Sequence, residues 1–125
     1  MRLLLDTNVV IWMLGVSSRL PPNVRETLSD PRNALFVSTS TIHEMAIKVS
    51  IGKLRVPNGF PESLADRGCT FLPLGVEDAW RVASLPLLHR DPFDRLIVAQ
   101  AMMNRLTLVT SDRQLADYGV PVILI

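Results

Sequence analysis

The chain has 125 residues, of which 48% are hydrophobic, 20% are charged and one is a cysteine. This composition is typical of one compact domain, and it excludes a disordered chain and a domain held together by internal disulfides. The net charge is only +1, so it neither indicates nor excludes a nucleic-acid partner, because a near-neutral total can hide an acidic pocket ringed by basic residues.

Short apolar runs alternate with helical patterns along nearly the whole sequence. Strands are predicted over 2–5, 34–40, 70–74, 106–110 and 120–125. Helices are predicted over 9–14, 22–28, 40–52, 61–68, 76–85, about 91–105 and 111–119. The strand runs are continuously apolar, as in strands buried on both faces of a parallel sheet. We therefore predict a single α/β domain over 1–125, with three layers and a central, twisted parallel sheet between helices.

Some side chains are predicted to pack in the core or to mark a buried helix face. Those expected in the core are Trp12, Met45, Cys69, Met102 and Met103. The residues that align on one face of the helix predicted over 76–85 are Val76, Ala79, Trp80 and Ala83. The apolar stretch LLLDTNVVIWML is interrupted by Asp6 and Asn8. We therefore expect a cytoplasmic protein without a membrane span or a signal peptide.

Four acids fall where the predicted sheet would gather them. Asp6 directly follows the first strand, and Asp112 follows LVTS. Glu44 and Asp94 lie in the first turns of predicted helices. In open α/β sheets, ligands bind beyond the carboxyl ends of the strands. Carboxylates converging there would repel one another, and a hard divalent cation such as Mg²⁺ or Mn²⁺ would remove that conflict.

Each of these acids also has a local structural explanation. Glu44 could complete a capping box with Thr41, and Asp112 could cap the helix that follows it. Asp91 is a good N-cap ahead of a proline at the first helical position. Asp6 has no obvious cap to make, so a structural role explains it least well.

Other catalytic arrangements are weakly supported. His43 and His89 lack the Cys/His spacing of a zinc site, and a surface or packing role is expected for each. The sequence has no G-x-S-x-G motif around a nucleophile and no glycine-rich phosphate loop.

Four stretches in a characteristic order carry a resemblance to a known family: LLLDTNVVIW, STSTIHEMAIKVSIGKL, HRDPFDRLIVAQA and LTLVTSD. Each is weak alone, but together they extend over nearly the whole chain. With them, the sequence resembles the PIN-domain ribonucleases, and among these the VapC-type toxins of type II toxin–antitoxin systems. One departure is His43, where the family pattern has a large aromatic residue, often tryptophan, ahead of the glutamate.

The resemblance implies a Mg²⁺- or Mn²⁺-dependent endoribonuclease. The residues it places in the catalytic metal site are Asp6, Glu44, Asp94 and Asp112. Those it places beside the site are Thr7, Asn8 and Ser111, with Asp91 as a helix cap that could support the site. Arg95 would anchor the HRDPFDR motif. Candidates for contacts with the RNA backbone are Lys48, Lys53, Arg55 and Arg90.

The resemblance also implies partners. These are an RNA substrate, a small DNA-binding antitoxin of the VapB type, and a second copy of the chain in a homodimer. The antitoxin is expected to dock on the helix over 9–14 and on the helix that carries Glu44.

Three other functions are weighed against this one from the sequence. A PIN-like domain without a toxin role would process or bind RNA. A dehalogenase-like phosphotransferase needs a second aspartate where Asn8 stands. A signalling receiver needs paired N-terminal acids and a lysine after the last strand, neither of which is found.

Overall fold

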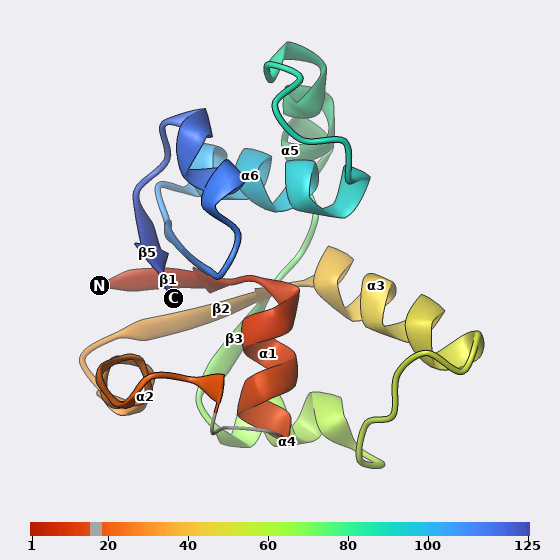
Figure 1. Cartoon of the computed structure of the whole chain (residues 1–125), viewed down its shortest axis with the longest axis vertical. Coiled ribbons are helices and arrows are strands. Elements are labelled where there is room, and N and C mark those ends of the chain that lie inside the picture. The colour runs from red at the N-terminus through yellow and green to blue at the C-terminus, as the bar shows by residue number, and fades with distance from the viewer. Residues whose placement is uncertain (16–18) are drawn as a thin grey trace.

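A five-stranded, fully parallel sheet forms the centre of the molecule in a computed structural model that describes residues 1–15 and 19–125 (Figure 1). The strands are β1 (Arg2–Leu5), β2 (Ala34–Ser38), β3 (Cys69–Leu72), β4 (Thr107–Thr110) and β5 (Val122–Leu124). Their order in the sheet is β3-β2-β1-β4-β5, and every neighbouring pair is parallel. The predicted parallel sheet is confirmed, and no strand bound differs from the predicted one by more than two residues.

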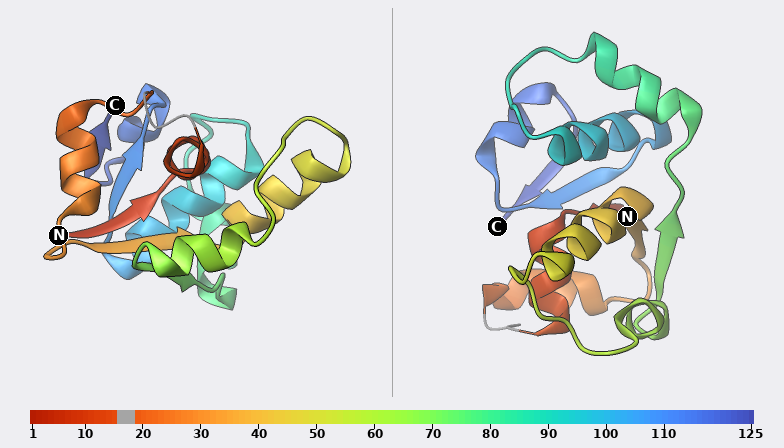
Figure 2. Two further views of the ribbon diagram at one scale, coloured as in Figure 1. Left: turned by 90° about the horizontal axis from the view of Figure 1, so that it is seen from below. Right: turned by 90° about the vertical axis from the view of Figure 1, so that its right-hand side faces the viewer.

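Helices cover both faces of the sheet, so the molecule has three layers, as Figures 1 and 2 show. One side carries α1 (Thr7–Leu14), α2 (Pro22–Ser29), α3 (Thr39–Ser50) and α4 (Phe60–Asp66). The other side carries α5 (Val76–Arg81), α6 (Pro92–Asn104) and the short 3₁₀ helices η2 (Val82–Ser84) and η3 (Arg113–Tyr118). Within these described ranges, no helix combines the length and the apolar character needed to span a membrane.

The alternation of side chains along β1 divides the core into two halves. Leu3 and Leu5 pack with the residues of α1 to α4, whereas Leu4 packs with those of α6. All three leucines are fully buried, and burial of a leucine contributes about 1.5–3 kcal/mol. Cys69 and Trp12 pack in the first half, as predicted. The continuous LLL run is therefore explained by the helices on both sides of the strand.

Strand order creates a switch point between β1 and β4. From β1 the chain proceeds outward through β2 and β3, and it later returns to the other side of β1 with β4 and β5. The backbone N–H of Asp6, just beyond β1, donates to the carbonyl oxygen of Val109 in β4 at 3.0 Å. In open α/β sheets the crevice at such a point, beyond the carboxyl ends of the strands, is where ligands bind.

The start of α3 corrects the prediction for Glu44. The helix begins at Thr39, because Ser38 caps it by accepting from the backbone N–H of Ser40 at 3.0 Å. Glu44 therefore lies in the second turn, beyond the reach of a capping box, and the predicted box with Thr41 is wrong. Because it caps no helix, the carboxylate of Glu44 is free to contact a residue of another element.

The predicted helix over 76–85 divides into α5 and η2, and its apolar face points outward. Val76 is 87% exposed and Trp80 is 78% exposed. The buried side instead carries Asp78, which accepts from the backbone N–H of Gly75 at 2.8 Å and from the side-chain amide of Asn104 in α6 at 3.3 Å. Polar contacts with α6 thus decide which face is buried. The prediction that Met103 belongs to the core is also wrong, since it is 42% exposed.

Candidate metal centre at the switch point

Asp6 lies at the centre of the switch point and is held by two hydrogen bonds. Its Oδ1 accepts from the backbone N–H of Thr7 at 2.7 Å, and its Oδ2 accepts from the hydroxyl of Thr110, at the end of β4, at 2.6 Å. The first bond makes Asp6 the N-cap of α1, so the expectation that this acid has no cap to make is wrong. Burial raises the pKa of Asp6, and the charges of Glu44 and Asp112 act in the same direction against these two hydrogen bonds.

Glu44 reaches the same place from α3. The hydroxyl of Thr7 donates to its Oε1 at 2.7 Å, which links α3 to the first turn of α1. Its other oxygen, Oε2, forms an ion pair with Lys48 one turn further along the helix, with an N–O distance of 3.0 Å. Lys48 therefore contacts an acid of the site, whereas the other basic residues predicted to contact RNA, namely Lys53, Arg55 and Arg90, are exposed.

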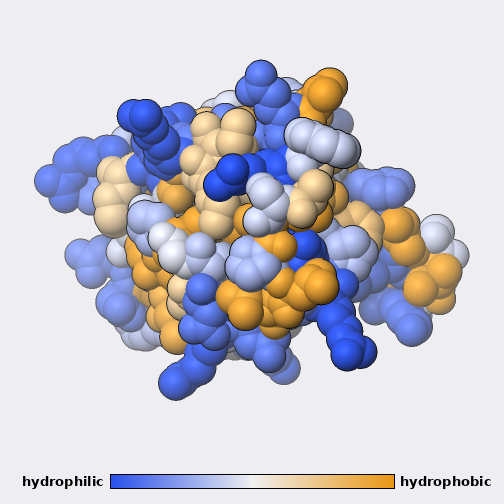
Figure 3. Space-filling model, turned by 90° about the horizontal axis from the view of Figure 1, so that it is seen from above, coloured by the Kyte–Doolittle hydropathy of each residue, from blue (hydrophilic) through white to orange (hydrophobic). Residues whose placement is uncertain are grey.

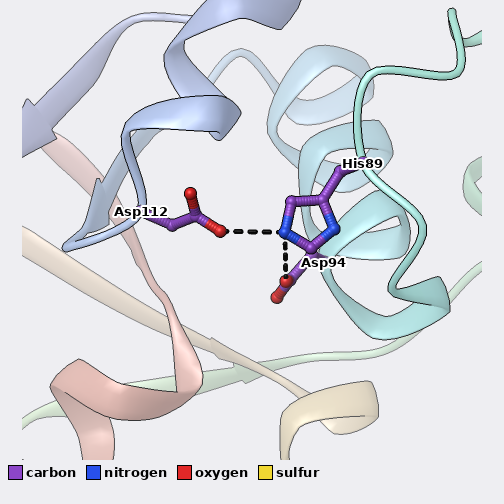
Figure 4. Close-up of side chains that lie close together, drawn as sticks. All are labelled: His89, Asp94 and Asp112. Carbon is purple, nitrogen blue, oxygen red and sulfur yellow. Dashed lines mark hydrogen bonds and ion pairs between the residues drawn. The ribbon is translucent and has the colours of Figure 1, made fainter.

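Asp94 and Asp112 come together around the imidazole of His89, as Figure 4 shows. The Nε2 atom of His89 lies 2.9 Å from Oδ2 of Asp112 and 3.3 Å from Oδ2 of Asp94. The three residues offer ligand atoms that all lie within 4.8 Å of one another. The other oxygen of Asp112, Oδ1, caps η3 by accepting from the backbone N–H of Gln114 at 2.9 Å.

The crowding of negative charge at this edge of the sheet shows in the pKa of Asp94. Burial, together with the negative charges of Asp6, Asp91 and Glu44, raises the pKa of Asp94 to about 7, although His89 opposes the shift. A carboxyl group that ionises near neutral pH indicates that the cluster holds more negative charge than its own hydrogen bonds compensate.

The HRDPFDR motif is built around the start of α6. Asp91 is the N-cap, as predicted, and accepts from the backbone N–H groups of Phe93 at 2.8 Å and Asp94 at 3.2 Å. Arg95 is 9% exposed and donates to backbone carbonyls of the preceding segment, including those of Val82 and Pro86, each at 3.1 Å. Its predicted anchoring role is confirmed.

The remaining residues predicted beside the site take different positions. Asn8 is exposed on α1, and Ser111 is half-buried directly after β4. Across residues 1–15 and 19–125, neither side chain hydrogen-bonds to one of the four acids. The structure thus brings Thr7 and Asp91 into the hydrogen-bond network of the site and leaves Asn8 and Ser111 beside it.

His89 is the residue that the sequence analysis missed. Its predicted surface or packing role is wrong, because its half-buried ring joins two of the acids. Its partner Asp112 is 23 positions away, so no local spacing could reveal the contact. The sequence did offer one hint that His89 belongs to the site: it stands two residues before the helix cap Asp91.

The donor set fits a hard divalent cation. The acids come from four different elements and offer carboxylate oxygens, which Mg²⁺ and Mn²⁺ prefer. In the part of the chain that the structure describes, the lysine and arginine side chains supply one ion pair to them, from Lys48. A cation with two charges would therefore relieve the repulsion that raises the pKa of Asp94.

Fold and site together define a class: α/β proteins with a carboxylate cluster at the switch point of a parallel sheet. A family model described as the PIN domain matches residues 3–121. The chain belongs to the PIN-domain family. A comparison with curated protein sequences finds no match.

Solved structures with the same fold include three toxin–antitoxin complexes. VapBC2 from Rickettsia felis, bound to a DNA fragment from its promoter, is 16% identical with a TM-score of 0.75, covering 99% of this chain and 98% of that one. DNA-bound VapBC from Salmonella typhimurium is 18% identical with a TM-score of 0.70, covering 98% and 97%. VapBC-5 from Mycobacterium tuberculosis is 20% identical with a TM-score of 0.63, covering 99% and 98%.

Proposed function

We propose that this chain is a cytoplasmic, metal-dependent endoribonuclease of the VapC toxin type. The substrate would be RNA, and Mg²⁺ or Mn²⁺ would be held by the four acids, Asp6, Glu44, Asp94 and Asp112. The observation that carries the proposal is the convergence of these acids on one edge of the sheet, although they lie 18 to 106 residues apart in the sequence. Their excess negative charge contributes to raising the pKa of Asp94 to about 7.

The protein groups around the acids would orient them for this task. Thr7 and Thr110 fix Asp6 and Glu44 through hydrogen bonds of 2.6 to 2.7 Å. A bound divalent ion lowers the pKa of a coordinated water and offsets negative charge on a phosphodiester. Because the acids alone would repel RNA, the site needs its cation for substrate binding as well as for hydrolysis.

The enzymatic part is tested with purified protein and labelled RNA. We expect cleavage in Mg²⁺ or Mn²⁺, loss of cleavage in a chelator, and loss of cleavage in Asp6→Asn and Asp94→Asn, which remove charge but hardly change side-chain volume. Asp66→Asn, at an exposed position at the end of α4, is the matched control and should cleave normally. Full activity of Asp94→Asn in the same metal would refute the assignment.

The toxin part requires an inhibiting partner, and we propose a VapB-like, DNA-binding antitoxin. The support is the likeness to structures described as VapBC complexes. An amphipathic antitoxin segment has an apolar surface available: a groove between the end of α1 and the loop that follows α3, lined in part by Ile11, Leu14, Arg55 and Val56. On α3, Ile47 and Val49 are also exposed and would add apolar area to such a contact.

Growth experiments separate a toxin from an RNA-processing enzyme. Expression of the wild-type chain alone should arrest growth, Asp94→Asn should not, and co-expression of a gene encoding a small DNA-binding protein next to this one should relieve the arrest. RNase activity without growth arrest would leave the nuclease assignment intact and refute the toxin role.

We further propose a homodimer. The face at the α5 end of the molecule mixes hydrophobic and hydrophilic side chains (Figure 3), and the exposed apolar side chains of α5 and the segment after it include Val76, Trp80 and Leu87. Burial of this surface against a second copy would remove it from water. Sedimentation analysis should show a dimer for the wild-type chain and a monomer for Trp80→Glu, and a monomeric wild type would refute the proposal.

A further inference from the structure

His89 carries two nitrogen atoms, and the structure gives each a different partner. Nε2 faces the carboxylates of Asp112 and Asp94, at 2.9 and 3.3 Å. Nδ1 accepts a hydrogen bond of 3.0 Å from the backbone N–H of Asp91. A backbone amide can only donate, so Nδ1 must present a lone pair to it and cannot carry a hydrogen. The ring hydrogen is therefore assigned to Nε2, the nitrogen that faces the two acids in Figure 4.

We infer that His89 is a positioning residue for the carboxylate site: its Nδ1 accepts from the backbone of Asp91, and its Nε2–H donates to Asp112 and lies 3.3 Å from Asp94. The tautomer follows from the contacts themselves. Only its consequences for metal binding rest on the proposed metal-dependent function. The tautomer excludes two roles that the cluster of His89, Asp94 and Asp112 would otherwise permit. With its hydrogen on Nε2, the ring can neither ligate a cation through that atom nor accept a proton there.

The segment that carries His89 is fixed on three sides. The backbone N–H of His89 donates to the hydroxyl of Tyr118, in η3, at 2.9 Å. Arg95 donates to the carbonyl oxygen of Pro86 at 3.1 Å and to that of His89 itself at 3.5 Å. Asp91 is fixed as the cap of α6, so its backbone N–H cannot easily turn away from the ring. The imidazole is therefore held in place before any ligand binds.

The consequence concerns the two acids on either side of the ring. Asp112 is held through Oδ1 by the backbone N–H of Gln114 and through Oδ2 by His89. Asp94 is not a helix cap, and across the described parts of the chain His89 supplies its only side-chain partner. Because Nε2 lies 2.9 Å from Asp112 and 3.3 Å from Asp94, the imidazole stands between two like charges and sets the distance between them. Partners that orient ligating carboxylates in this way typically change metal affinity about 10- to 100-fold when they are removed.

The tautomer can be measured directly in metal-free protein labelled with ¹⁵N-histidine. The chain has only two histidines, so the variant His43→Gln assigns both rings. Two-bond ¹H–¹⁵N spectra should show a protonated Nε2 and an unprotonated Nδ1 for His89, and the pattern should persist when Mg²⁺ is added. A protonated Nδ1 in the metal-free protein would overturn the inference, whether or not the chain cleaves RNA.

The same inference predicts the spectrum of bound Mn²⁺. Pulsed electron paramagnetic resonance detects a ¹⁴N nucleus that is directly coordinated to this ion. We expect no directly coordinated nitrogen in the wild-type protein. A nitrogen signal that disappears in His89→Gln and persists in His43→Gln would make His89 a ligand and would overturn the positioning role.

Metal affinity then tests the donor function with matched variants. Glutamine carries an N–H donor about as far from the backbone as Nε2, whereas leucine has a similar size and no donor. We expect His89→Leu to bind Mn²⁺ about 10-fold more weakly or worse, and His89→Gln to stay within a few-fold of wild type. His43→Leu, at an exposed position, should be unchanged. Unaltered Mn²⁺ affinity in a folded His89→Leu protein would refute the role.

Discussion

Replacing Asp94 by asparagine should stabilise the metal-free protein while destroying its ability to bind metal. Asp94 has a pKa of about 7 in the folded chain against an ordinary value of 3.8, chiefly because of burial and of the charges of Asp6 and Asp91. A carboxyl group with a raised pKa in the folded state destabilises the fold when it ionises. The free energy of unfolding should therefore rise as the pH falls from about 7 towards 4, and Asp94→Asn should remove this dependence.

The size of the effect follows from the shift. Each pKa unit corresponds to about 1.4 kcal/mol, so a shift from 3.8 to about 7 sets an upper limit of roughly 4 kcal/mol at pH 8. The side chain of Asp94 is 20% exposed, and solvent screens part of the repulsion, so we expect about 2 kcal/mol. For a chain of this length that corresponds to a rise in melting temperature of roughly 5–10 °C.

The assay is thermal and urea unfolding in a chelator, at pH 6 and pH 8, followed by the same measurement in Mg²⁺. Wild type should be less stable at pH 8 than at pH 6, Asp94→Asn should exceed wild type at pH 8, and Mg²⁺ should stabilise wild type but not Asp94→Asn. The exposed Asp66→Asn variant controls for a general loss of negative charge. If Asp94→Asn is less stable than wild type at pH 8 in the chelator, the reasoning about charge crowding fails.

Two further predictions concern hydrogen bonds at the site. Asp91→Ala removes the cap of α6 and should lower the free energy of unfolding by about 1 kcal/mol, whereas Asp91→Asn, which also caps helices, should cost only a few tenths; equal losses in urea unfolding would contradict the cap. Thr7→Val removes the hydroxyl that donates to Glu44 at 2.7 Å and should weaken Mn²⁺ binding about 10-fold, while Thr7→Ser should restore it. If the serine variant binds Mn²⁺ as weakly as the valine variant, the hydroxyl is not the group that matters.

The sheet and the position of the acids could be predicted from the sequence because both depend on local patterns. A continuous run such as LLL, followed at once by Asp6, identifies a buried parallel strand and the edge at which it ends. The same logic applies to LVT and Asp112. Strand order was not needed, since parallel strands place their carboxyl ends at one edge whatever their order.

What could not be predicted depends on contacts between distant segments. The helix over 76–85 has a regular apolar face, yet Asp78 meets Asn104 of α6 and Trp80 faces outward. Periodicity identifies a face but not its partner, and an apolar face that a second molecule would cover looks the same as a core face. His89 was missed for a related reason, since its ring meets Asp112 only after η3 and the segment before α6 pack together.

The sequence analysis treated capping a helix and holding a metal as alternative roles for an acid. In this fold one acid can do both, because both roles fall at the same place. A helix that follows a parallel strand begins at the carboxyl edge, so its cap stands beside the site. Asp6 and Asp112 each use one oxygen, Oδ1, to cap a helix and turn the other towards neighbouring site groups, the hydroxyl of Thr110 and the ring of His89. Capping thereby orients these carboxylates for the cation that we propose they bind.

This double role determines which substitution is informative. Asparagine at Asp6 or Asp112 keeps an oxygen that can cap and removes the charge, whereas alanine removes both. Asp112→Asn should therefore lose Mn²⁺ binding with little change in the free energy of unfolding of the metal-free protein, and Asp112→Ala should lose binding and about 1 kcal/mol of stability. If the asparagine variant keeps wild-type Mn²⁺ affinity, the charge of Asp112 does not hold the cation, and its role is confined to the cap of η3.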